Sequence, residues 1–201
     1  MKRSLIDRRW LISGALALAG CGLSERPYLQ KRVWPLAVQR PDMRAPNPRG
    51  RTLLIRTMQS GPGLEARGLQ SLQADGSVRV DFYEEWAVPP ALGVEGSLRQ
   101  WLAGSGLFAA ILAPGSRMEA DWVLETTLTA FIAEPTQHRA RAAMTVVVLD
   151  QRTAGTRVLM QRALTAEAPL AHAEAPAIVA ALLHALAALL AQTEQAVAGM
   201  R

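Results

Sequence analysis

The chain has one cysteine, Cys21, which closes an N-terminal segment of distinctive composition. The start of that segment carries four basic residues: Lys2, Arg3, Arg8 and Arg9. Residues 10–19 are then mostly apolar, but they are too few to cross a bilayer as a helix. A lone cysteine also excludes a disulfide within the chain, so the folded part must be held together by packing.

The tetrapeptide Leu18-Ala19-Gly20-Cys21 resembles a bacterial lipobox at all four positions. A basic start, a short apolar stretch and small residues before the cut are typical of an export signal. The match predicts a lipoprotein signal peptide over residues 1–20, with diacylglycerol on the Cys21 sulfur and acylation of the new amine after cleavage. Two or three acyl chains hold a protein on a membrane far more firmly than one.

The export route stays open. Arg8-Arg9-Trp10-Leu11-Ile12 resembles a twin-arginine signal, although Asp7 stands before the pair. Paired arginines are also common in ordinary signal peptides, so the sequence allows both routes.

The net charge of +5 overstates the basic character of the exported protein. Removing residues 1–20 takes away four basic residues and Asp7, which leaves 18 basic and 16 acidic residues, a net charge of +2. This balance argues against a nucleic-acid-binding protein. We expect residues 21–35 to form the lipid anchor and tether, and residues 36–201 to form one domain with a sizeable core.

Periodicity and turn residues predict an α+β domain after the signal peptide. Strands are expected at 33–38, 53–58, 64–72, 78–83, 107–112, 122–132, 142–149 and 157–164. Pro90 should open a first helix that ends at Gly104, and a second should run from Pro176 to Ala198. Short loops between the last three strands favour a largely antiparallel sheet, with both helices packed on one face.

Two of these strands should bury one face. In the strand at 78–83, Val78, Val80 and Phe82 alternate with polar residues and are expected to face the core. In the strand at 157–164, the residues expected to point inward are Val158, Met160 and Leu164.

No catalytic or metal-binding constellation stands out. The three histidines, His138, His172 and His184, lack the spacing of metal ligands. Glu84 and Glu85 are adjacent, so on a strand they point to opposite faces and form no two-carboxylate pair; a solvated turn is expected. We therefore predict a protein that is not an enzyme and that has no cofactor and no metal.

Trp86-Ala87-Val88-Pro89-Pro90 is the most distinctive internal stretch. One interpretation is a contact for a peptide or a lipid. The other, which we favour, is structural: Trp86 fills the junction between sheet and helix, while Pro89 and Pro90 fix the start of the helix.

The order of several short motifs resembles the ABC-type transport auxiliary lipoproteins, the PqiC/YmbA-like group. The matching stretches are Tyr28-Leu29, 60–64, 86–90, 105–108, 120–125, 180–182 and 185–186. Gly93, Gly96 and the segment 70–75 depart from the family pattern. The resemblance implies a periplasm-facing lipoprotein that accompanies an ABC permease, an ATPase and an inner-membrane protein with a mammalian-cell-entry (MCE) domain in lipid transport.

Gly22 follows the cysteine, where an aspartate would signal retention in the inner membrane, so outer-membrane anchoring is expected. Within this setting the sequence leaves alternatives open. The domain is either a docking module for the MCE-domain partner or a carrier that holds an acyl chain in its interior. A carrier needs an oversized apolar cavity, whereas a docking module needs a closed core. An outer-membrane assembly lipoprotein of the LptE type is a further alternative, and a homo-oligomer is also possible.

Overall fold

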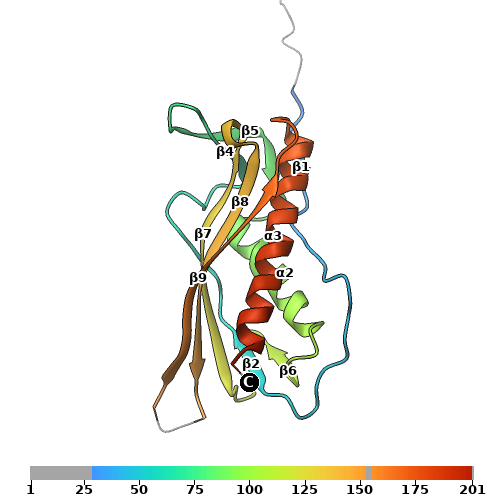
Figure 1. Ribbon diagram of the computed structural model, residues 1–201, viewed down its shortest axis with the longest axis vertical. Coiled ribbons are helices and arrows are strands. Elements are labelled where there is room, and N and C mark those ends of the chain that lie inside the picture. Colours follow the sequence, from blue (N-terminus) through green and yellow to red (C-terminus); the bar gives the residue numbers. More distant parts are fainter. Residues whose placement is uncertain (1–28, 153–154, 201) are drawn as a thin grey trace, which may run out of the picture. The chain divides into compact units, whose positions relative to one another are not determined.

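Residues 29–152 and 155–200 are described by the computed structural model, and the elements from Lys31 onward belong to one structural unit. The signal peptide, Cys21 and most of the expected tether lie outside the described residues. The unit contains nine strands, two α-helices and one 3₁₀ turn within the described chain (Figure 1). Their bounds are β1 Arg32–Trp34, β2 Thr52–Ile55, β3 Gln59–Ser60, β4 Gly68–Leu72, β5 Val78–Trp86, α2 Pro90–Ala103, β6 Ala110–Leu112, β7 Trp122–Glu134, η1 Pro135–Gln137, β8 Arg139–Asp150, β9 Arg157–Pro169 and α3 Ala175–Ala198.

The long strand β7 is the hub of the sheet. Along one side it pairs antiparallel with β8 over its whole length, and β8 pairs antiparallel with β9. Along its other side it meets β2, β3 and β4 in turn, each in parallel. The sheet therefore branches: β2 leads to β6 at one end of β7, and β4 leads to β5 and β1 at the other.

The α+β class is confirmed, but the sheet is mixed rather than antiparallel throughout. The long ladders of β7, β8 and β9 are antiparallel, as the short loops predicted. The short strands add five parallel pairings, which the sequence did not predict. Helix α2 lies between β5 and β6 in the chain, and the whole segment from β3 to α2 separates β2 from its parallel neighbour β6.

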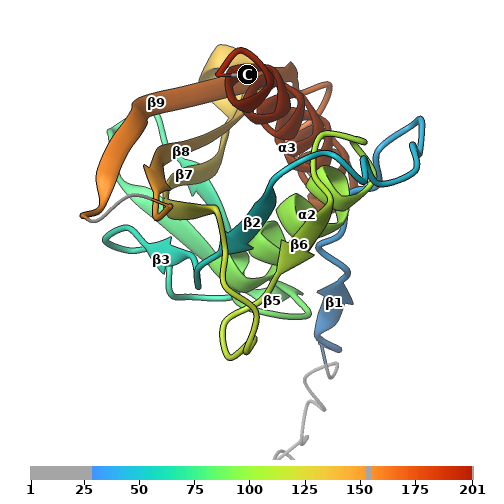
Figure 2. The same ribbon diagram turned by 90° about the horizontal axis from the view of Figure 1, so that it is seen from below.

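Both helices lie on one side of the sheet, which curls around them (Figures 1 and 2). Helix α3 packs mainly on β8 and β9. Within the described chain it is the one helix long and apolar enough to cross a bilayer by length and composition. Its leucines 182, 186, 189 and 190 are fully buried in the domain core, so packing accounts for its apolar character.

Helix α2 starts at Pro90, as expected, and buries Val94, Leu98, Trp101 and Leu102. Gly93, one of the departures from the family pattern, has a local cause. A Cβ at this position would lie 2.8 Å from a methyl carbon of Leu36, so the chain before β2 lies too close to the helix for a side chain.

Several expected strands are shorter than their apolar runs. The residues beyond their ends are buried without strand pairing: Leu36 and Val38 after β1, Leu64 before β4, and Phe108 before β6. The backbone amide of Val38, for example, donates a hydrogen bond to Ser97 Oγ in helix α2 (3.1 Å). Contact with the helix thus replaces a sheet partner, which an alternation pattern does not reveal.

The prediction of which residues point inward from two strands is wrong in part. Val78, Val80 and Phe82 of β5 are exposed, and so is Val158 of β9, whereas Met160 is buried as expected. Val158 lies at the tip of the β8–β9 hairpin, next to the turn. Val78 and Val80 lie on the face of β5 that is turned away from the helices, and Phe82 lies in a bulge of the same strand.

Candidate interaction surface

The residues singled out in the sequence lie in different parts of the chain. Cys21 lies outside the described residues. Trp86 ends β5 with 1 % of its surface exposed, and its ring centroid lies 5.5 Å from that of Phe131 on β7. Its backbone amide donates to the carbonyl oxygen of Arg67 (2.8 Å).

The two prolines connect this strand end to helix α2. Pro89 is the residue before the helix, and its carbonyl oxygen accepts hydrogen bonds from the amides of Leu92 (3.0 Å) and Gly93 (3.2 Å). Pro90 is the first helical residue and is buried. Trp86 and Pro90 therefore lie inside the junction of sheet and helix, where a peptide or lipid cannot reach them without a rearrangement.

Strand β5 is interrupted by a large bulge before it reaches Trp86. Gly68 of β4 pairs with Glu85, whereas Gln70 pairs with Val80. Two steps along β4 therefore match five along β5, which leaves three extra residues on β5. We call residues 81–84 the β5 bulge.

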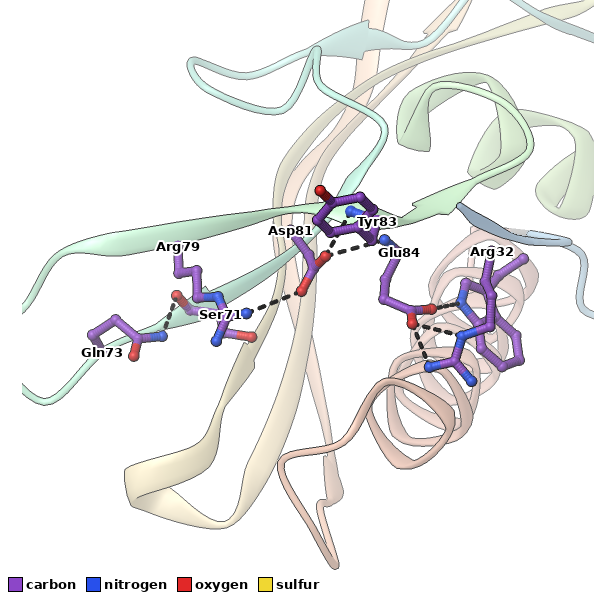
Figure 3. Close-up of polar contacts among 8 residues, drawn as sticks. Arg32, Ser71, Gln73, Arg79, Asp81, Tyr83 and Glu84 are labelled. Atoms are coloured by element: carbon purple, nitrogen blue, oxygen red, sulfur yellow. Dashed lines mark hydrogen bonds and ion pairs between the residues drawn. The ribbon is translucent and has the colours of Figure 1, made fainter. Parts of the chain in front are cut away.

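Asp81 holds the bulge in shape. Its Oδ1 accepts hydrogen bonds from the backbone amides of Tyr83 (2.8 Å) and Glu84 (3.1 Å), and its other oxygen pairs with Arg79 (Figure 3). A short acidic side chain that caps its own backbone in this way is a common means of fixing a turn. Gly68 is required opposite, because a Cβ there would lie 2.3 Å from the Asp81 carbonyl oxygen.

Glu84 fastens the bulge to β1. Its carboxylate accepts hydrogen bonds from Arg32 Nε (2.6 Å) and from Trp34 Nε1 (2.7 Å), and Arg32 is also its partner in the parallel pairing (Figure 3). Glu85 pairs with Arg67 (2.8 Å) and Lys31 (3.5 Å). The expected solvated turn at these two glutamates is therefore wrong: both lie on a strand, largely shielded from solvent, and both have cationic partners.

The exposed apolar side chains of the described chain gather on this β1–β5 ribbon. Five of the ten large ones lie there: Val33, Val78, Val80, Phe82 and Tyr83. Phe82 is 68 % exposed and Tyr83 41 %, and their rings meet edge to face with centroids 5.1 Å apart. Lys31 Nζ lies 4.3 Å from the centre of the Phe82 ring. Arg79 and Asp81 line a hollow beside the first turn of α3, so Val78 and Val80 project from the opposite face.

The core residues of the described unit, which come from both helices and the sheet, form one continuous apolar cluster. Three open hollows on the surface of the described residues differ in polarity. The largest of these three, about 600 Å³, is bordered by Asp121, Arg152 and other polar groups. The most apolar, about 370 Å³, lies between Met43 and α2 and includes Arg40 and Gln100. A third, about 310 Å³, lies on the outer face of β7 and β8 and is lined by threonines.

The histidines do not form a site. His138 caps the 3₁₀ turn between β7 and β8, and His172 and His184 are exposed at the start and on the outer side of α3. Within residues 29–152 and 155–200, no group of three histidine, cysteine or acidic side chains is placed to hold a metal ion.

Three acidic side chains of the described chain, Glu95, Glu134 and Asp150, are buried without any signal in the sequence analysis, and Glu134 is the most buried of them. Glu134, at the end of β7, is almost fully buried and accepts hydrogen bonds from Arg139 Nε (2.6 Å) and Arg141 Nε (2.7 Å) of β8. Burial works to raise the pKa of Glu134, but the hydrogen bonds from the two arginines outweigh it and hold the pKa below its usual value. The hairpin register brings the three together, since Glu134 pairs with Arg139 and Ile132 with Arg141.

A model of a known family matches most of this chain. It is described as the ABC-type transport auxiliary lipoprotein component, and it covers residues 35–193. The chain belongs to the ABC-type transport auxiliary lipoprotein family. The resemblance drawn from the short motifs is confirmed, and with it a lipoprotein family of the cell envelope that is not a class of enzymes.

Solved structures share the fold of this family member at low identity. Protein XCC0632 from Xanthomonas campestris superposes with a TM-score of 0.73 at 17 % identity, over 84 % of this chain and 96 % of that one. An uncharacterized protein gives 0.64 at 14 % identity, over 84 % and 99 %. Protein CT253 from Chlamydia trachomatis gives 0.50 at 12 % identity, over 72 % and 96 %. No curated protein matches the chain.

Proposed function

We propose that this protein is the outer-membrane-anchored, periplasm-facing auxiliary lipoprotein of an ABC/MCE-type lipid transport system, and that it acts by docking a partner. The observation that carries the proposal is the family match over residues 35–193. The partner is the MCE-domain inner-membrane protein that works with an ABC permease and an ATPase.

The N-terminal lipid determines where the domain works. Arg32, where β1 begins, lies eleven positions after Cys21, and this stretch reaches about 36–40 Å when fully extended. A lipid on Cys21 therefore keeps the domain beside its own membrane and prevents it from shuttling cargo to the other one. The same anchor raises the effective concentration of the domain for a partner that arrives at that membrane.

The continuous apolar core supports docking over carriage. An acyl chain needs a deep apolar cavity, because each exposed CH₂ costs about 0.8 kcal/mol in water. The apolar hollow at Met43 is open and contains the polar side chains of Arg40 and Gln100, so it does not offer such a cavity.

We assign the partner contact to the outer edge of β9. This strand has 13 residues and pairs only with β8 in the described chain. An unpaired edge offers a row of backbone donors and acceptors to which a partner strand can add. The first half of the strand, near the hairpin tip, extends along the sheet beyond helix α2 and away from β1 and β5 (Figure 1).

Co-purification tests the proposal. The full lipoprotein, extracted in mild detergent, should recover an MCE-domain protein. Ala163→Asp places a charge on the exposed face of β9 and should weaken that recovery. Leu92→Asp is the matched control, because Leu92 is exposed on α2 and should leave recovery unchanged. Purified protein that carries stoichiometric phospholipid and recovers no MCE-domain protein would instead favour the carrier.

A further inference from the structure

The β5 bulge is fixed in shape by specific residues of the domain. Gly68 and Asp81 are both needed for its shape, and Glu84 and Glu85 fasten it to its neighbours. The result is that two aromatic side chains are held out into solvent. A domain that needed only stability would gain by turning Phe82 inward, since burial of such a side chain is worth a large part of a marginal stability.

The path of the chain shows what lies near the bulge. The described chain begins at Leu29 and enters β1 three residues later, and Arg32 of β1 pairs with Glu84 of the bulge. The eight residues 21–28 extend at most about 26–29 Å. The lipid tether therefore enters the domain at β1, directly beside the bulge.

The chemistry of the bulge suits a bilayer interface. The Phe82 ring is wholly apolar, and Tyr83 adds a phenolic hydroxyl. Aromatic rings with a polar group are enriched where the acyl chains meet the headgroups. The ammonium group of Lys31 lies 4.3 Å from the centre of the Phe82 ring and 3.5 Å from Glu85, so a cation stands directly beside the aromatic pair. The cations Lys31, Arg32, Arg67 and Arg79 face three carboxylates that are already paired with them, so the contact is mainly aromatic and only weakly electrostatic.

We propose that Phe82 and Tyr83 insert into the headgroup layer of the membrane that holds the Cys21 lipid, as a second contact that orients the domain. This inference rests on the proposed function, because it needs the lipid anchor to bring the bulge to the bilayer. The tether alone leaves the orientation of the domain free, and the second contact fixes that orientation. The β1–β5 ribbon then faces the membrane, and the β8–β9 hairpin, at the opposite end of β7, faces the periplasm.

A single-cysteine label tests the contact in the full lipoprotein. The sulfur of Cys21, the only native cysteine, is consumed by the lipid, so Phe82→Cys provides one reactive thiol for an environment-sensitive NBD dye. Val158→Cys, 57 % exposed at the hairpin tip, is the matched control. Both proteins are reconstituted into phosphatidylethanolamine and phosphatidylglycerol vesicles, with and without lipids that carry a quenching doxyl group at a shallow position.

We expect blue-shifted emission and loss of intensity to doxyl lipid at position 82, with aqueous emission and no quenching at position 158. Aqueous emission at both positions, in protein that floats with the vesicles and carries the acyl mass on Cys21, would overturn the membrane contact and leave the proposed function standing. A blue shift at position 82 without quenching would show a protein neighbour, such as a second copy or the transport partner, and would also overturn it. Protein that neither floats nor carries acyl mass would defeat the proposed function and this inference together.

Discussion

Replacing Trp86 by alanine should destabilise the domain strongly, because this ring fills the junction of β5 and α2. The side chain is 1 % exposed and packs against Phe131. A tryptophan buries about 150–250 Å², which at about 25 cal/mol per Å² corresponds to about 4–6 kcal/mol of transfer free energy. Measured truncations of buried aromatics cost about 3–5 kcal/mol.

That loss is large against a total stability of about 5–15 kcal/mol. For a domain of this size, each kcal/mol lowers Tm by about 2–4 °C, so Trp86→Ala should lower Tm by about 6–20 °C. The assay is thermal unfolding followed by circular dichroism. Trp86→Phe is the control, because it keeps an aromatic ring beside Phe131 and should retain most of the stability. Should Trp86→Ala keep its Tm and lose recovery of the MCE-domain partner, the structural interpretation of this residue would be refuted.

Three further predictions concern the bulge, a buried charge and the anchor. Gly68→Ala should destabilise the domain by roughly 1–3 kcal/mol in urea unfolding, because its Cβ would lie 2.3 Å from the Asp81 carbonyl oxygen. Gly96→Ala is the control: this helix position is exposed with nothing within 4 Å, so the change should stabilise the domain by about 0.5–1 kcal/mol. Equal effects of the two substitutions would contradict the steric argument. The lowered pKa of Glu134 stabilises the fold at pH values above the usual glutamate pKa, and this contribution is lost as the pH falls through the lowered value; Glu134→Gln should flatten the fall of Tm with acidification, and an unchanged slope would count against it. Cys21→Ala should move the protein out of the membrane fraction, and the wild type should sediment with outer-membrane markers in a density gradient; co-sedimentation with inner-membrane markers would overturn the sorting.

The sequence predicted best those elements whose pattern is long and local. Helix α3 was expected from Pro176 and begins at Ala175, because a wide apolar stripe leaves little choice of face. The antiparallel ladder of β7, β8 and β9 followed from loops too short for a crossover. The parallel pairings of β2, β3 and β4 with β7 could not be predicted, because they join segments that are far apart in the sequence and only two to five residues long.

The polar contacts, too, could be predicted only where the partners are close in the sequence. The contact of Glu134 with two arginines follows from the hairpin register, so a register for β7 and β8 would have revealed it in the sequence. The partners of Glu84 and Glu85 come from β1 and from the segment before β4, and no local pattern brings them together. The local expectation of a solvated turn therefore failed because distant cations compensate both charges.

The failed prediction for β5 is the most informative one. Alternation places Val78, Val80 and Phe82 on one face, and they do alternate as far as Val80, but that face looks away from the helices. Apolar side chains on a solvent face break the usual agreement between pattern and fold, and such breaks concentrate at functional sites. Neighbouring residues stabilise this arrangement, because Gly68 leaves room for the bulge and Asp81 fixes its backbone. The 13 residues of β7 separate this ribbon from the hairpin tip by roughly 40 Å. A membrane contact at one end and a partner contact at the other can therefore be made at the same time, which a docking lipoprotein requires and a soluble carrier does not.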